Sequence, residues 1–450
     1  LARRGARCLV YDEKPEHELA AAIAALRPLP GVELRLGDPT CAGIEAADLI
    51  LPSPGVDPAG ELLAAARRRG QPILSEIEIA YRIARAPIVA VTGTNGKTTT
   101  VLMIAAALQA AGFAATVCGN TRAGGQQRPL IAAADVASPE EWLVAEVSSF
   151  QLELTERFAP RVAVITNITS DHLDRHRTLA AYIAAKARIL AAQRPADWAV
   201  LNADNPATRD LDGQVRGRRL WFTRGEPPER GGWVESRDGE RWLCVRVAEA
   251  SEPLLPARAL RIPGEQTIEN ALAAACAARA VGAPAEAIAR ALAAFRGVPD
   301  RLEYVMTLRG VDYVNNSMCT NVDAAVRSVR AYDRPLVVIA GGREKGSNDF
   351  APLGRALAER ARALVTIGVH GERIAAAARA AGLAEIHAAE SMETAVRCAA
   401  RLARPGDVVL LAPACASFDW FRNFEDRGEA FRAAVRALAA EASDASSPTR

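Results

Sequence analysis

The sequence is poor in lysine: only Lys14, Lys97, Lys186 and Lys345 stand among its 55 basic residues, and the other 51 are arginine. Arginine cannot replace a compact ammonium group or an amine that gives up its proton. A chain that uses arginine almost everywhere is expected to keep lysine where that chemistry is needed, although chance retention explains some cases. Each of the four lysines is therefore a candidate site residue.

Other absences narrow the class of protein. The eight cysteines form no C-x-x-C pair, which argues against a disulfide or zinc framework and is typical of reduced thiols in the cytoplasm. The formal net charge of +2 predicts no surface for nucleic acid. No apolar run reaches the roughly 18 to 20 residues that span a membrane. We expect a cytoplasmic, monomeric protein that acts on small molecules, without nucleic acid or membrane as a partner.

Short β-branched runs alternate with alanine-rich helical segments through most of the chain. This rhythm predicts an α/β fold with parallel sheets, and a length of 450 residues predicts about three domains. The expected boundaries are 1–86, 87–296 and 297–450. Residues 214–262 predict a small antiparallel excursion.

The first region is expected to hold strands at 7–14, 31–37 and 47–56. The chain opens without methionine, on what reads as the end of a helix before a strand. We therefore expect that residues preceding Leu1 are missing.

Residues 89–100 read VAVTGTNGKTTT and predict a strand, a glycine turn and a helix that begins near Lys97. Backbone N–H groups at a helix N-terminus bind phosphate, Lys97 can reach the outer phosphates, and the Thr98 hydroxyl can bind Mg²⁺. The common G-x-x-x-x-G-K-[ST] pattern would need glycine where this chain has Val91. The alternative is an Asn-Gly turn with an accidental lysine.

Two further segments carry groups that suit a metal. Glu146, in AEVSSFQLE (145–153), follows an expected strand and can hold Mg²⁺, although a cap or surface role is as common. NITSDHLDRH (167–176) holds two histidines and two aspartates. It predicts a metal shell or a polar cluster beside phosphate, with a zinc hydrolase or a helix cap at Asp171 or Asp174 as alternatives.

Lys186 lies in YIAAKARIL (182–190), on an otherwise apolar helical face. The interpretation without a functional role is a surface lysine whose aliphatic stem covers apolar neighbours. The scarcity of lysine favours a functional role, but the spacing does not say which one.

Taken together, TGTNGKTT, EVSSFQLE, NITSDHLDRH and AAKARI resemble the central domain of the Mur ligases, the ATP-dependent amino-acid ligases of peptidoglycan synthesis. The family loop is G-x-x-G-K-[ST], so Val91 is no defect. Two more segments, at 341–350 and 410–431, resemble the branch that adds glutamate to UDP-N-acetylmuramoyl-L-alanine. The resemblance runs from about residue 8 to 437.

The resemblance implies three domains: a truncated Rossmann-like domain that binds UDP, a central P-loop ATPase domain, and a C-terminal Rossmann-like domain that closes over ATP. It also implies a reaction. ATP phosphorylates the terminal carboxylate of the UDP substrate, and the glutamate amine then attacks the acyl phosphate.

By the same resemblance, ATP contacts are expected at Gly93, Thr94, Asn95, Gly96, Lys97, Thr98, Thr99, Asn270, Arg301 and Asn316. Thr98 and Glu146 are expected to hold one Mg²⁺, His172 a second, and Lys186 to be carbamylated. Contacts to the UDP substrate are expected at Asp12, Lys14, Ser53, Pro54, Gly55 and Asn120, and contacts to glutamate at Thr320, Lys345, Ser417 and Phe424. The implied catalytic groups are Lys97, Glu146, His172, Lys186, Lys345 and Ser417.

The sequence departs from the family pattern at three positions. The chain has Asn316 where the family pattern has an aspartate, Met318 where it has a lysine, and Thr267 where it has an asparagine. These changes leave the amino acid open between D-glutamate, L-glutamate and another amino acid. Two other functions also remain: an amidating subunit that activates a lipid-linked carboxylate for a glutaminase, and a ligase of the folylpolyglutamate type.

Overall fold

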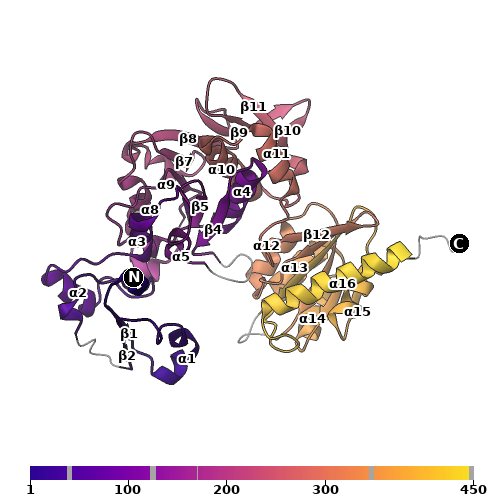
Figure 1. Cartoon of the computed structure of the whole chain (residues 1–450). Coiled ribbons are helices and arrows are strands. Elements are labelled where there is room, and N and C mark those ends of the chain that lie inside the picture. The colour runs from indigo at the N-terminus through magenta and orange to yellow at the C-terminus, as the bar shows by residue number, and fades with distance from the viewer. Residues whose placement is uncertain (38–42, 122–127, 170, 344–348, 445–450) are drawn as a thin grey trace.

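The computed structural model describes residues 1–37, 43–121, 128–169, 171–343 and 349–444. Strands form three sheets of two, nine and six members, and helices cover them. The predicted α/β class with parallel-rich sheets is confirmed. Figure 1 shows the six-stranded sheet and its helices as a lobe of their own, with α16 (Phe424–Asp444) lying across it.

The first region is small. Strands β1 and β2 pair in parallel, and Leu63 and Ala66 of α2 pack with Ile50 in a minor core. The strand expected at 47–56 is wrong, because only an isolated bridge from Ile50 to Ile73 forms there. Pro52 and Pro54 have no N–H to give to a ladder. The elements are β1 (Cys8–Asp12), α1 (Glu16–Ala24), β2 (Val32–Leu36) and α2 (Glu61–Arg68).

The central sheet has the strand order β11-β10-β9-β8-β7-β6-β3-β5-β4. Strands β3 to β9 are joined by parallel pairing, whereas β9, β10 and β11 pair antiparallel, as predicted for that segment. The strands are β3 (Ile88–Thr92), β4 (Ala115–Gly119), β5 (Trp142–Glu146), β6 (Val162–Ile165), β7 (Trp198–Asn202), β8 (Arg218–Thr223), β9 (Gly231–Arg237), β10 (Glu240–Arg246) and β11 (Glu252–Pro256).

Alternation along β3 divides the core of this region in two. Val89 and Val91 face one cluster with α4, α10 and α11, and Ile88 and Ala90 face the other with α3, α5 and α8. The helices are α3 (Glu76–Ile83), α4 (Lys97–Ala110), α5 (Leu130–Ala134), α6 (Ser149–Leu152), α7 (Leu173–His176), α8 (Leu179–Ala191), α9 (Pro206–Arg209), α10 (Glu265–Val281) and α11 (Ala285–Ala294).

The third sheet has the order β12-β13-β17-β14-β15-β16, and only the β12–β13 hairpin is antiparallel. Helices α12 to α14 cover one face, and α15 and α16 cover the other. The strands are β12 (Glu303–Leu308), β13 (Val311–Asn315), β14 (Leu336–Gly341), β15 (Ala361–Ile367), β16 (Ile386–Ala388) and β17 (Val408–Ala414). The helices before α16 are α12 (Val322–Arg330), α13 (Ala351–Arg360), α14 (Gly371–Ala380) and α15 (Met392–Leu402).

The order of the strands decides which loops meet. Strand β3 lies between β5 and β6, so the segments that follow these three strands share one carboxyl edge. In the third sheet, β13, β17 and β14 likewise end side by side. Among the described residues, no helix is both long and apolar enough to cross a membrane.

Candidate active site

The loop after β3 is held in place by residues that follow β6. Thr94 donates its N–H to the Asn167 carbonyl at 2.8 Å, and the Asn95 N–H donates to the Asn167 side-chain oxygen at 3.0 Å. The loop then runs straight into α4 at Lys97, which gives it a helix N-terminus for phosphate. The strand, glycine turn and helix start lie where the sequence predicts them, and phosphate binding by this loop stays a prediction.

Both glycines of this loop face other chain segments closely. Gly93 has φ +149°, and a Cβ there would overlap the Thr166 hydroxyl. Gly96 has φ +83°, and a Cβ there would overlap the side-chain oxygen of Asn270, which also accepts from the Thr100 hydroxyl at 3.3 Å. Only glycine fits either position without displacing these groups.

Lys97 is folded back over the loop. Its Nζ donates to the carbonyls of Gly93 at 3.1 Å and Thr94 at 2.9 Å. Burial lowers the pKa of Lys97, and the charges of Glu146 and Asp171 oppose that effect. Thr99, the next predicted ATP contact, lies half-buried in the first turn of the same helix.

Glu146 ends β5 beside the start of α4. The Thr98 hydroxyl donates to its carboxylate at 2.7 Å, and only 4% of the residue is exposed. Burial raises the pKa of Glu146, while the Thr98 hydrogen bond and the charges of Lys97 and Arg301 lower it. A buried carboxylate beside a hydroxyl offers the oxygen ligands that Mg²⁺ prefers, so these two residues fit that ion.

The two histidines of the 167–176 segment have different surroundings. His172 is exposed, with φ +50°, and its Nε2 lies 3.6 Å from Asp171. His176 is buried and hydrogen-bonds Ser149 at 2.9 Å through Nε2, with Glu153 3.2 Å from Nδ1. Only His172 is open to a ligand.

The segment also shows a structural role that the sequence did not reveal. The rings of His172 and His176 both pack on Phe150, and Arg175 lies over the same ring. Arg175 reaches Glu153 at 3.0 Å and Asp57 of the first region at 3.9 Å. Burial lowers the pKa of His176, so its ring is neutral near pH 7. The described residues contain no group of three or more histidine, cysteine, aspartate or glutamate side chains able to hold a metal.

Lys186 on α8 is buried, with 1% of its surface exposed, so the interpretation as a surface lysine is wrong. Its Nζ donates to the Gly93 carbonyl at 2.8 Å and lies 4.5 Å from the centre of the Tyr182 ring. Burial, and next the charge of Lys97, lower the pKa of Lys186 to about 7. A large share of this amine is therefore neutral at pH 7.

On the side of the third sheet, Arg301 donates to the Met318 sulfur at 3.2 Å and acts electrostatically on Lys97 and Glu146. Asn316 is buried, donates to the Ser328 hydroxyl at 2.7 Å and accepts from the Leu302 N–H at 3.2 Å. Its amide is therefore engaged inside the third region.

The residues predicted to contact glutamate follow the carboxyl ends of strands in the third sheet. Ser417 is buried, Thr320 and Phe424 are half-buried, and Lys345 lies outside the described residues. Arg427, which the sequence did not single out, joins their segments. Its guanidinium donates to the Ser317 carbonyl at 2.9 Å and the Cys415 carbonyl at 3.0 Å, and burial lowers its pKa to about 10.

The residues predicted for the UDP substrate do not form one cluster. Ser53 and Pro54 line a small pocket together with Phe150, Gln151 and Arg175. Gly55 lies in the same turn, which the Val56 N–H closes on the Ser53 carbonyl. Asn120 is exposed and follows β4, with its N–H on the Glu146 carbonyl. Asp12 accepts from the Lys14 N–H at the end of β1.

Comparison with known proteins identifies the family of the chain. Residues 91–278 match the Mur ligase middle domain, and residues 300–415 match the Mur ligase glutamate ligase domain. The UDP-N-acetylmuramoylalanine–D-glutamate ligase of Pelotomaculum thermopropionicum is 44% identical, over 97% of this chain and 94% of its own length. The enzyme of the same name from Acidobacterium capsulatum is 41% identical, over 97% and 92%.

Solved structures share the fold at lower identity. A UDP-N-acetylmuramoyl-L-alanyl-D-glutamate–2,6-diaminopimelate ligase has a TM-score of 0.62 at 19% identity, over 87% of this chain and 95% of its own. The UDP-N-acetylmuramate–alanine ligase of Thermotoga maritima has a TM-score of 0.56 at 19% identity, over 96% and 99%. The motifs, the fold and these relatives agree, and the chain belongs to the Mur ligase family.

Proposed function

We propose that the protein is an ATP-dependent ligase that joins D-glutamate to UDP-N-acetylmuramoyl-L-alanine in peptidoglycan precursor synthesis. The observation that carries the proposal is the meeting of Lys97, Thr98, Glu146 and Lys186 around one phosphate loop. Relatives of that name at 39–44% identity, over nearly the whole chain, support the choice of substrates.

The reaction has two steps. The terminal carboxylate of the UDP substrate attacks the γ-phosphorus of ATP, the bond to ADP breaks, and an acyl phosphate forms. The glutamate amine then attacks the acyl carbon and loses a proton, and the bond to phosphate breaks to leave an amide. Both steps move negative charge between oxygens, so positioning and cations are expected to supply most of the rate enhancement.

The chain's own groups suit these needs. In our proposal the loop 93–99 and Asn270 hold the phosphates and nucleotide, and Lys97 turns from the Gly93 and Thr94 carbonyls to the outer phosphates. Thr98 and Glu146 would hold one Mg²⁺ and His172 a second, and the ions would neutralise charge on phosphate oxygens. Arg301 adds a cation to the same side, since its charge already reaches Lys97 and Glu146.

We also propose that Lys186 is carbamylated. The neutral amine attacks CO₂, a bond from nitrogen to carbon forms, one proton leaves, and the product offers carboxylate-like oxygens. The lowered pKa supports this step, because only an unprotonated amine can react. Arginine could not take this role, which agrees with a lysine kept in an arginine-rich chain.

On the third sheet, Thr320, Ser417 and Phe424 are proposed to bind glutamate, with Lys345 as the cation for its side-chain carboxylate. The first region, 1–86, is proposed to bind the UDP substrate through Asp12, Lys14 and Ser53–Gly55, with Asn120 contributing from the central region, 87–296. Region 297–450 is proposed to close over ATP. We further propose that the protein works as a cytoplasmic monomer; sedimentation at micromolar concentration tests the last point.

A coupled assay of ADP release tests the function. With ATP, Mg²⁺ and bicarbonate present, ADP should appear only when UDP-N-acetylmuramoyl-L-alanine and D-glutamate are both added. L-Glutamate, D-aspartate and L-lysine, tested in turn, should give less than about a tenth of that rate. Absence of ADP release with both substrates overturns the proposal, and equal rates with L-glutamate overturn the stated stereochemistry.

A further inference from the structure

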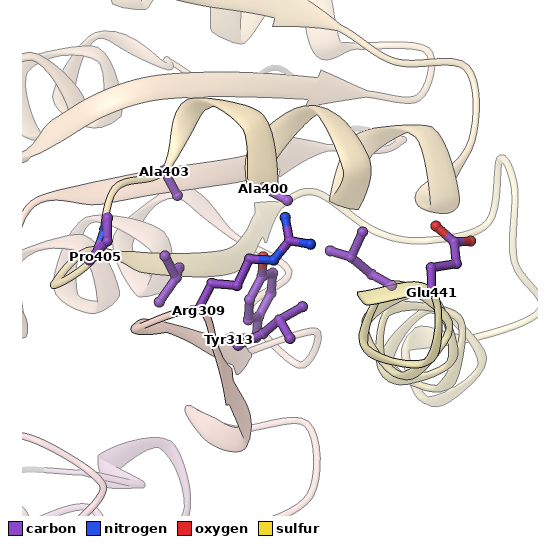
Figure 2. Close-up of a pocket in the computed structure, with 9 residues that line it drawn as sticks. Arg309, Tyr313, Ala400, Ala403, Pro405 and Glu441 are labelled. Atoms are coloured by element: carbon purple, nitrogen blue, oxygen red, sulfur yellow. The ribbon is translucent and has the colours of Figure 1, made fainter. Parts of the chain in front are cut away.

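A second cavity lies at the opposite edge of the third sheet from the predicted amino-acid residues. It is bounded by the β12–β13 turn, the start of β13, the end of α15, the loop before β17 and the last turns of α16 (Figure 2). Its volume of about 570 Å³ falls in the ~300–1,000 Å³ range of small-molecule sites. We call it the rear pocket. Its lining residues are Leu308, Arg309, Val311, Tyr313, Ala400, Ala403, Pro405, Leu438 and Glu441.

Most of the wall is apolar. Aliphatic carbon from Leu308, Val311 and Leu438 faces alanines of α15 and Pro405. Such a surface binds a hydrocarbon body and does not suit a fully polar ligand such as glutamate or a nucleotide phosphate. The few polar groups therefore decide which ligand can enter.

Two hydrogen-bond donors meet inside this apolar wall. Only 2% of Tyr313 is exposed, and its hydroxyl has no hydrogen-bond partner among the described residues. Figure 2 shows the Arg309 side chain reaching into the pocket beside Tyr313 and Ala400. Within the part of the chain that the structure describes, the Arg309 guanidinium makes no hydrogen bond or ion pair. Burial raises the pKa of Tyr313, with the charge of Arg309 opposing, so its hydroxyl remains a donor at neutral pH.

The backbone at Arg309 is a second, independent observation. The hairpin turn places Arg309 at φ +52° and Gly310 at φ +76°, the left-handed region that favours Asn-Gly in a two-residue turn. A Cβ makes this conformation costly for arginine. Residues held in such conformations cluster at binding sites, and here the turn aims a cation into a cavity.

The single acidic group in the lining does not cancel that cation. Glu441, at the rim on α16, forms a two-pronged ion pair with Arg397, at 2.7 and 2.6 Å. Glu441 is thus held by a residue outside the pocket, which Glu393 shares at 3.1 Å. Among the described residues, the Arg309 guanidinium is left as a lining cation without an ion pair, and the Tyr313 hydroxyl as a donor without a hydrogen bond.

We propose that the rear pocket binds a small carboxylic acid with an apolar body, whose carboxylate accepts from the Arg309 guanidinium and the Tyr313 hydroxyl. Guanidinium and carboxylate match in geometry and charge, and the bond strengthens inside an apolar wall. None of the lining residues is among those predicted for ATP, the UDP substrate or glutamate. The site therefore lies outside the proposed function.

Isothermal titration calorimetry with 4-phenylbutanoate, 4-phenylbutylamine and 4-phenylbutan-1-ol tests the proposal. These probes share one apolar body and differ in the charged end. The acid should bind the whole protein at least about tenfold more tightly than the amine or the alcohol. Equal binding of the three probes, or no saturable binding of the acid up to about 10 mM, overturns the proposal.

Two variants and one control locate the site. Asparagine tolerates the left-handed turn, so Arg309→Asn should keep or raise the thermal midpoint of unfolding. The same variant should weaken the binding of 4-phenylbutanoate at least about tenfold. Ala400→Phe should fill the cavity and abolish binding. Arg401→Gln, an exposed arginine nearby on α15, should leave the affinity within about twofold. Retained binding in Arg309→Asn contradicts the site. Arg309→Asn should also keep its rate of ADP release, which separates this outcome from failure of the proposed ligase activity.

Discussion

The carboxyl edges of the two large sheets differ in how their charges are arranged. At the central edge, Lys97 and Lys186 both donate to the Gly93 carbonyl, and Glu146 faces them beside the Thr98 hydroxyl. At the third-sheet edge, the buried Arg427 donates to two backbone carbonyls and to the Ser317 hydroxyl. Exposed side chains there include Phe418 and Trp420, at 61% and 38%, together with Arg422.

The two edges therefore offer different groups to a substrate. At the central edge, Lys97 has a lowered pKa and bonds to the Gly93 and Thr94 carbonyls, so phosphate can attract this cation away. Lys186 has a pKa of about 7 and is instead the proposed site of carbamylation. At the third edge, the buried Arg427 serves the fold, because it joins the segments that follow two strands. We expect substitutions at the central edge to affect chemistry, and substitutions at the third edge to affect mainly amino-acid binding.

The largest expected effect is at Lys97. Lys97→Ala removes the cation nearest the loop and should lower kcat by about a thousandfold, as for loss of a major group that stabilises the transition state. Thr320→Ala, at the other edge, should raise the KM for glutamate about tenfold and leave kcat within threefold. ADP release at varied ATP and glutamate measures both. Similar losses of kcat in the two variants would contradict the division between chemistry at the central edge and amino-acid binding at the third.

Lys186→Ala should lower kcat by about a hundredfold, because it removes the proposed carbamate. Formate or acetate should restore part of the rate by placing a carboxylate in the space left open. Lys186→Arg is the matched control: its guanidinium fills that space and cannot be carbamylated, so the same additives should do nothing. Full activity of Lys186→Arg would contradict the proposed role.

The pKa of Lys186 predicts a pH dependence of stability. Between about pH 7 and 10.5 the unfolded chain holds a proton on this amine that the folded chain has released, so wild-type stability rises with pH. Lys186→Met lacks this dependence. The free energy of unfolding of Lys186→Met should exceed that of the wild type most at pH 7 and below. Above pH 7 this difference should shrink by up to about 1.4 kcal/mol per pH unit.

Urea unfolding in buffers free of bicarbonate measures this difference, since CO₂ would consume the amine. A constant gap between the two proteins from about pH 6.5 to 9.5 would show that Lys186 titrates near its ordinary pKa.

The smallest effects are expected at two of the three departures from the family pattern, Asn316 and Met318. Asn316→Asp should change stability by less than about 1 kcal/mol, because the Ser328 hydroxyl can turn from the Ala324 carbonyl to donate to a carboxylate. Met318→Lys places an ammonium beside Arg301 and should change the KM for ATP or glutamate by about two- to fivefold. Unchanged KM values in both variants would mark these positions as neutral drift.

The local sequence pattern predicted much of the candidate site. Alternating apolar runs and a glycine turn predicted where β3 ends and α4 begins, and a carboxylate at the end of β5 could be placed beside them because parallel strands share an edge. The lysine count directed attention to Lys97 and Lys186. The same argument could not find Arg427, because one arginine among 51 carries no such distinction.

The burial and partners of individual side chains could not be predicted from the sequence, because they depend on contacts between distant segments. His172 and His176 are four residues apart, yet one is exposed and the other is bound between Ser149 and Glu153, which lie on another element. The burial of Lys186 under the loop follows from how α8 packs on β3. No strand forms at 47–56 because Pro52 and Pro54, which lack an N–H group, follow the apolar run directly.

The two glycines of the phosphate loop also limit how this protein can change. Every single-base change of a glycine codon that yields another amino acid adds a Cβ. At Gly93 and Gly96 that carbon would meet the Thr166 hydroxyl or the Asn270 side chain. Escape from an inhibitor seated on this loop would therefore have to arise at positions other than these two glycines.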